Sequence, residues 1–112
     1  MTQAMTASSL DYVSFYRDQT VFLTGATGGL GACILYKLAV ELPTRKIYAL
    51  VRSLPKAKQT WQKLMPDHFM AMVNSEKIVL VLGDIMKPSL GIEAATLAKV
   101  AHDTTIVINS VS

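Results

Sequence analysis

The segment Thr-Gly-Ala-Thr-Gly-Gly-Leu-Gly at residues 24–31 joins a short apolar strand pattern to a helical pattern. Gly25 lets the chain leave the strand in a conformation that a side chain would forbid. Gly28 removes a Cβ that would hold the backbone away from a pyrophosphate, and Gly31 lets the helix lie close to the sheet. A glycine-rich bridge with this spacing predicts a dinucleotide-binding turn.

The start of the following helix supplies the expected anion contacts. From Gly29 onward, the first helical turn directs unpaired backbone N–H groups and the positive end of the helix dipole towards the anion. The residues expected to contact the nucleotide here are Thr24, Gly25, Thr27, Gly28, Gly29, Leu30 and Gly31. The alternative is a tight turn from strand to helix that holds no ligand.

The rest of the chain alternates strand and helix patterns. Strands are expected at residues 20–24, 46–51, 77–82 and 105–109. Helices are expected at residues 29–41, 55–74 and 92–101, with the second divided so that a new helix begins at Pro66. The order βαβαβαβ predicts an α/β fold: the N-terminal portion, about four strands, of a Rossmann-like doubly wound parallel sheet. We expect a leader at residues 1–19 and a partial NAD(P)-binding Rossmann domain at residues 20–112.

The composition indicates one globular domain, because 51% of the 112 residues are hydrophobic and 17% are charged. No apolar run approaches the roughly 18 residues that span a bilayer, so we expect a soluble cytoplasmic protein with no transmembrane segment. A net charge of +3 is too small to predict nucleic-acid binding. We expect the lone Cys33 to be a small core residue. A stripe on the second helical region also predicts core packing: Trp61, Leu64, Met65, Phe69, Met72 and Val73.

Open parallel sheets bind ligands outside the carboxyl ends of their strands. Arg52 directly follows the second strand, where an NAD site usually carries an acid, and Lys56 and Lys58 come soon after. A cation at this position favours the 2′-phosphate of NADP(H) over NAD. The alternative is that Arg52 only caps a strand in water.

The third and fourth strands also end in polar residues. Asp84 can accept the adenine amino hydrogen while the backbone N–H of Ile85 donates to a ring nitrogen, and Asn109 ends the fourth strand. The alternative role of Asp84 is that of a turn or cap residue. His68 and His102 lack partners at metal-ligand spacing, so we assign no metal site and no chemistry to them.

With these residues in view, the chain resembles the extended short-chain dehydrogenase/reductase superfamily. The likeness is greatest to the N-terminal part of fatty acyl-CoA reductases and related thioester reductase domains. It runs through residues 15–16, 21–31, 47–52 and 83–91, where the Leu-Val-Arg strand end and the Gly-Asp-Ile and Pro-x-Leu-Gly segments are the narrower markers. The chain departs from the family pattern at Gly29, where a bulky residue is common, and at Val111-Ser112, where two alanines are usual.

The resemblance implies NADPH as hydride donor and, in a full-length form, an acyl thioester of coenzyme A or a carrier protein as acceptor. Family members protonate the developing alkoxide with a Tyr-x-x-x-Lys pair, and this chain contains none. We therefore assign no catalytic residue and expect the chain to be inactive alone. We also expect self-association, because the fourth strand would be an exposed edge.

Two alternatives stay open. The first is a stand-alone NADP-binding or regulatory module, and the second is a non-functional truncated fragment. A third reading within the superfamily is a fragment of a nucleotide-sugar epimerase or dehydratase. Arg52 and the Pro-x-Leu-Gly segment argue against this third reading.

Overall fold

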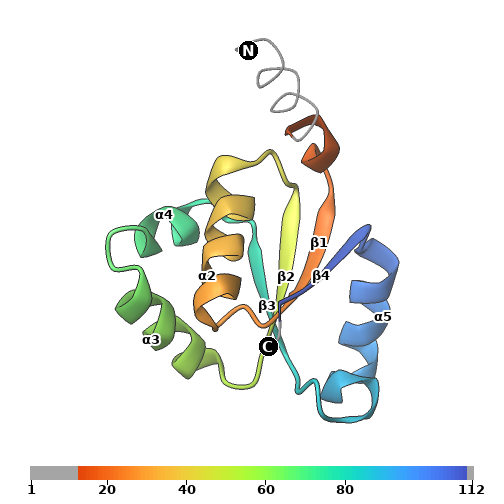
Figure 1. Ribbon diagram of the computed structural model, residues 1–112. Coiled ribbons are helices and arrows are strands. Elements are labelled where there is room, and N and C mark those ends of the chain that lie inside the picture. The colour runs from red at the N-terminus through yellow and green to blue at the C-terminus, as the bar shows by residue number, and fades with distance from the viewer. Residues whose placement is uncertain (1–12, 111–112) are drawn as a thin grey trace.

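A computed structural model describes residues 13–110 of the chain, and its centre is one parallel sheet (Figure 1). The strands are β1 (Thr20–Thr24), β2 (Lys46–Val51), β3 (Ile78–Leu82) and β4 (Ile106–Asn109). Their order in the sheet is β3-β2-β1-β4, and all three pairings are parallel. The α/β Rossmann-like fold is thereby confirmed, with four strands. Of the expected leader, the structure describes residues 13–19, and residues 13–16 are helical.

Helices cover both faces of the sheet, as Figure 1 shows. One face carries α2 (Gly29–Tyr36) with its extension η1 (Lys37–Glu41), α3 (Leu54–Leu64) and α4 (Phe69–Asn74). The other face carries α5 (Ala94–Asp103), preceded by the short turn η2 (Pro88–Gly91). Among the described residues, no helix has both the length and the apolar character needed to cross a membrane.

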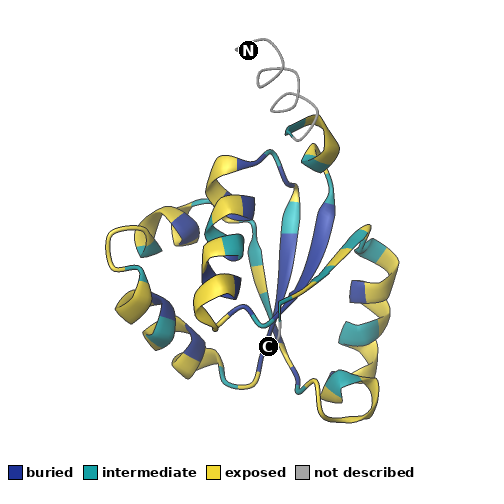
Figure 2. Cartoon of the chain, in the orientation of Figure 1, coloured by how far each residue is buried: buried dark blue, intermediate teal, exposed yellow. Residues whose placement is uncertain are grey.

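The central strands are buried because side chains alternate between the two covered faces. Val21 and Leu23 of β1 pack under α2 to α4, whereas Phe22 packs with the residues under α5. All five residues of β1 are buried, but β3 and β4, at the edges of the sheet, are partly exposed (Figure 2). The expected edge position of the fourth strand is confirmed.

The expected second helix at Pro66 is wrong by three residues, since α4 begins at Phe69. Met65 takes an extended φ of −139°, because the residue before a proline is disfavoured in the helical region. The break also splits the expected apolar stripe. Trp61 and Met72 are buried, but Leu64 and Val73 are half exposed.

The prediction that Cys33 belongs to the core is also wrong, because its side chain is exposed. The buried positions of α2 are Gly31, Ala32 and Leu35, and Cys33 faces away from them. The helix then widens in η1, where the N–H of Leu42 donates to the carbonyl of Lys37 (3.0 Å), five residues earlier.

A polar link fastens α5 to the sheet far from the glycine turn. The hydroxyl of Tyr48, buried on β2, donates to Oδ2 of Asp103 at 2.6 Å, and Nδ1 of His102 lies 3.2 Å from Oδ1. Burial and the hydrogen bond to Asp103 raise the pKa of Tyr48 from 10.0 to about 12. The hydrogen bond from Tyr48 also lowers the pKa of Asp103.

Tyr48→Phe should lower the free energy of unfolding at neutral pH by about 1 kcal/mol, because Asp103 loses its donor. The unfolded phenol ionises near pH 10.0 and the folded one near 12. The contribution of Tyr48 is therefore complete below pH 10 and is lost as the pH rises through 12. Urea unfolding of both proteins should show their stability difference narrowing across this interval. A difference that stays constant would contradict the link.

Candidate nucleotide-binding site

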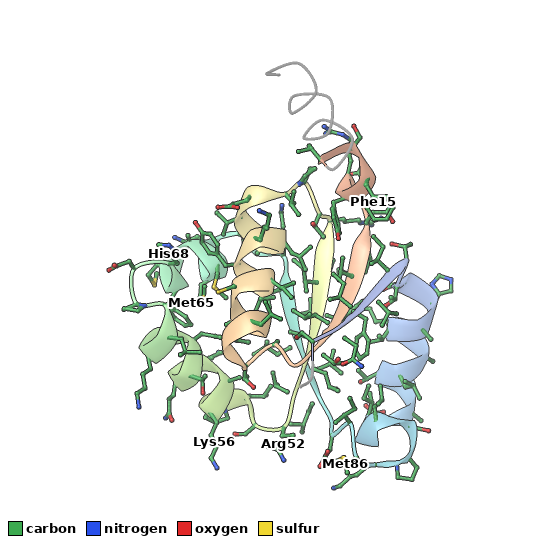
Figure 3. All side chains as sticks on the ribbon, in the orientation of Figure 1. Phe15, Arg52, Lys56, Met65, His68 and Met86 are labelled. Atoms are coloured by element: carbon green, nitrogen blue, oxygen red, sulfur yellow. The ribbon has the colours of Figure 1, made fainter. Side chains whose placement is uncertain are left out.

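The carboxyl ends of β1, β2 and β3 surround a hollow of about 280 Å³. Its lining residues are Thr24, Gly25, Thr27, Leu50, Val51, Arg52, Gly83, Asp84, Ile85 and Met86. Six predicted site residues are thus brought together from three separate strand ends. Figure 3 shows Arg52 between Lys56 and Met86 at the end of the sheet where α2 begins.

The glycine turn has the geometry that its spacing predicts. Gly25 has a φ of 74°, and the N–H of Gly28 donates to its carbonyl at 3.2 Å. Gly28 is the N-cap of α2, and no side chain caps the helix there. Gly29 and Leu30 follow in the first turn, with Leu30 69% exposed. The start of α2 therefore presents backbone donors to the solvent beside the hollow.

The three glycines differ in what requires them. A Cβ on Gly31 would lie 1.7 Å from the carbonyl oxygen of Gly25, so only glycine fits. A Cβ on Gly28 would make an ordinary 3.6 Å contact with the same oxygen, and one on Gly29 would meet nothing within 4 Å. Of these three glycines, packing within the chain requires only Gly31. The reason predicted for Gly28 is different, namely the close approach of a ligand to its backbone.

Trp61 holds the glycine turn from the side, a role that the sequence analysis missed. Its Nε1–H donates to the carbonyl of Ala26 at 2.9 Å, and both residues are buried. This bond fixes the middle of the turn to α3. Trp61 lies 35 residues further along the chain and sits in an apolar stripe, so no local pattern marks its partner.

Thr24 and Asn109 are joined to each other across β1 and β4. The hydroxyl of Thr24 donates to Oδ1 of Asn109 at 2.6 Å, and that of Ser110 donates to the carbonyl of Thr24 at 2.7 Å. These bonds fasten the edge strand beneath the turn. Asn109 does not line the hollow, and its cofactor contact stays a prediction.

Asp84 acts as a turn residue and also forms a wall of the hollow. Its Oδ1 accepts from the N–H of Met86 at 2.9 Å, and its own N–H donates to the carbonyl of Leu90 at 2.6 Å. The side chain of Asp84 therefore has the alternative role, that of a turn residue. Its contact with adenine stays a prediction. Ile85 lies beside it on the same wall.

The three cations that follow β2 lie in different places in the structure. Arg52 is exposed and lines the hollow. Lys56 is exposed on the first turn of α3, near its cap Ser53. Lys58 instead borders a larger groove of about 570 Å³ between α3, α4 and β3. None of the predicted site residues lines that mostly apolar groove, and we assign it no ligand.

The two histidines lie away from the hollow. His68 packs against the ring of Tyr36, with centroids 4.7 Å apart, and His102 borders Asp103 on α5. Within residues 13–110, no three His, Cys, Asp or Glu side chains gather as a metal ion requires.

The sequence of this chain is similar to one protein family and to several known proteins. The model of an NAD-binding family described as "Male sterility protein" matches residues 23–112. Fatty acyl-CoA reductase wat of Drosophila melanogaster is 34% identical over 106 residues, which cover 86% of this chain and 20% of that protein. Hybrid PKS-NRPS synthetase phm1 of Pyrenochaetopsis sp is 41% identical over 92 residues, which cover 82% of this chain and 2% of that protein.

Solved reductase domains share the fold. The reductase domain of a non-ribosomal peptide synthetase from Mycobacterium tuberculosis matches with a TM-score of 0.70 and 26% identity, over 83% of this chain and 24% of that one. The terminal R domain of the myxalamid PKS-NRPS pathway matches with a TM-score of 0.68 and 31% identity, over 84% of this chain and 25% of that one. The chain thus spans a quarter or less of these proteins. Val111 and Ser112, noted as departures from the family pattern, lie outside the described residues.

Gly31→Ala should destabilise the protein by about 1–3 kcal/mol or more, because the new Cβ must displace the backbone of Gly25. Gly29→Ala is the matched control and should stay within about 1 kcal/mol of the wild type, because its Cβ enters open space and alanine favours helix. Urea unfolding of both variants makes the comparison. Equal stabilities would show that the turn does not need the close approach at Gly31.

Proposed function

Because the chain belongs to the NAD-binding family described as "Male sterility protein", we propose that it is the NADP(H)-binding part of an acyl-thioester reductase. The chain is an N-terminal nicotinamide-dinucleotide-binding portion of thioester reductase-like proteins. The choice of NADP(H) over NAD, and of an acyl thioester as the substrate, is the more specific part of this proposal. The observation that carries the choice of NADP(H) is Arg52, an exposed cation on the wall of the strand-end hollow, directly after β2.

The residues of the hollow fit the cofactor. The N–H groups of Gly29 and Leu30 at the start of α2 bind the pyrophosphate, with no side chain capping them. Asp84 and Ile85 border the adenine. NADPH, when bound, supplies the hydride. The part of this chain is to hold and orient the nucleotide.

Arg52 selects the phosphorylated cofactor. The guanidinium lies where an acid would accept the ribose hydroxyls of NAD, and it pairs with a 2′-phosphate through charge-assisted hydrogen bonds. Such a bond contributes about 1.5–3 kcal/mol, which corresponds to roughly a tenfold to hundredfold preference.

The acyl thioester is proposed from the relatives, one of which is named as a fatty acyl-CoA reductase. The 112 residues contain no Tyr-x-x-x-Lys pair. We therefore propose that they bind the cofactor without reducing a thioester.

A second candidate function is that of a stand-alone NADP-binding module that completes its sheet with another copy. The observation in its favour is β4, an edge strand with Val107 67% exposed and with Ile106 and Ile108 half buried. Unpaired backbone groups on such an edge favour pairing with another strand.

Arg52→Ala should reduce the preference for NADPH over NADH by about tenfold to a hundredfold, mainly by weakening NADPH. Calorimetric titration of both nucleotides measures the two dissociation constants. Lys63→Ala, at an exposed position outside the hollow, is the matched control. An unchanged ratio of the NADPH and NADH dissociation constants in Arg52→Ala would remove Arg52 from the site.

Long-chain acyl-CoA added to the wild type together with NADPH should leave the NADPH absorbance constant. Oxidation of NADPH would overturn the proposed inactivity.

The edge-strand alternative predicts a dimer in light scattering, which Val107→Lys should convert to a monomer by placing a charge on the edge. Val79→Lys, on β3 at the opposite edge, is the control and should leave the dimer intact. A monomeric wild type that still binds NADPH would contradict this alternative.

A further inference from the structure

Arg52 borders a second hollow, of about 260 Å³, beyond the one described above. Its lining residues are Arg52, Leu82, Gly83, Asp84, Lys87 and Gly91. Arg52, Gly83 and Asp84 line both hollows and form the partition between them. A nucleotide that reaches from the start of α2 across the first hollow therefore meets the second one at Arg52.

Lys87 is held in this second hollow by a loop that closes on itself. The N–H of Lys87 donates to the carbonyl of Asp84 at 3.0 Å, and the carbonyl of Lys87 accepts from the N–H of Leu90 at 3.0 Å. The N–H of Asp84 returns to the carbonyl of Leu90 at 2.6 Å. The backbone of Lys87 is thus tied on both sides to the wall that carries Asp84.

The end of this loop is strained. Ser89, Leu90 and Gly91 have consecutive φ values of 53°, 58° and 60°, in the left-handed region that a leucine rarely adopts. A Cβ on Gly91 would lie 3.3 Å from Cδ of Lys87, so the stem of that lysine runs along the glycine backbone. Strain of this kind persists where the surrounding structure holds it and is common at ligand sites.

The charges of the hollow leave it cationic. Among residues 13–110, the ion pairs within 4.0 Å are Lys37 with Glu41 and His102 with Asp103, so neither Arg52 nor Lys87 is paired with a carboxylate. Asp84 is the one acid in the lining, and its Oδ1 already accepts from Met86. Two cations against one carboxylate favour an anion in the hollow.

We propose that Lys87 is a second specificity-determining cation, which together with Arg52 binds the 2′-phosphate of NADP(H). This inference rests on the proposed function, because it needs the adenosine in the first hollow. Arg52 then contacts the phosphate from the end of β2, and Lys87 contacts it from the loop after β3. The selectivity for NADP(H) is shared between two strand ends.

The test titrates the 112-residue chain with NADPH, with NADH and with adenosine 2′,5′-bisphosphate. Lys87→Gln should weaken NADPH and the bisphosphate about tenfold and leave NADH unchanged. Lys87→Arg keeps the charge and should retain most of the preference. Lys63→Gln, an exposed lysine on α3 outside both hollows, is the matched control.

The outcomes separate the two proposals. If Arg52→Ala narrows the NADPH preference and Lys87→Gln does not, the role of Lys87 is overturned while the proposed function stands. If Lys87→Gln weakens NADPH and NADH equally, the lysine acts only through the shape of the loop, and the inference also fails. If the folded wild type binds no nucleotide, both proposals fall together.

Discussion

The close approach between the start of α2 and the end of β1 is the constraint on which this structure depends. Gly31 lies directly on the carbonyl of Gly25, and any side chain at that position would enter the backbone. The approach brings the first N–H groups of α2 to the carboxyl edge of the sheet. Trp61 and Ser110 hold the same turn from two sides, through the carbonyls of Ala26 and Thr24.

We propose that different strand ends contact different parts of the nucleotide. The turn after β1 offers backbone donors without side-chain charge, which suits the common diphosphate of every dinucleotide. We propose that the residues that distinguish one nucleotide from another lie at Arg52 after β2 and in the loop from Asp84 to Gly91 after β3, where they line the two hollows. On this account affinity and selectivity arise from different elements of the sheet.

The strands were predictable from the sequence because buried parallel strands form nearly continuous apolar runs bounded by polar residues. Residues 20–24 and 46–51 match β1 and β2, and the other two strands begin one residue later than expected. The glycine turn was predictable because its spacing reflects local steric limits. The exposure of Cys33 was not, since a short apolar helix shows little contrast between its two faces.

The residues missed at the site depend on contacts between distant parts of the chain. Trp61 donates to a carbonyl in the glycine turn, and Lys87 lines the same hollow as Arg52 only because β2 and β3 lie side by side. In the sequence, Trp61 stands among core residues and Lys87 in a loop between helix and strand patterns. No local sequence pattern therefore indicates the contact of Trp61 or the proposed role of Lys87.

We propose that the diphosphate of the nucleotide binds at the start of α2. The most direct measurement is the change in backbone amide chemical shifts of the isotope-labelled chain when NADPH is added. If the diphosphate binds there, the largest changes are expected at Gly28, Gly29 and Leu30, with further changes at Asp84 and Ile85. Changes confined to other residues, such as those near Tyr48 on β2 and Asp103 at the C-terminal end of α5, would show that the diphosphate does not bind at the start of α2.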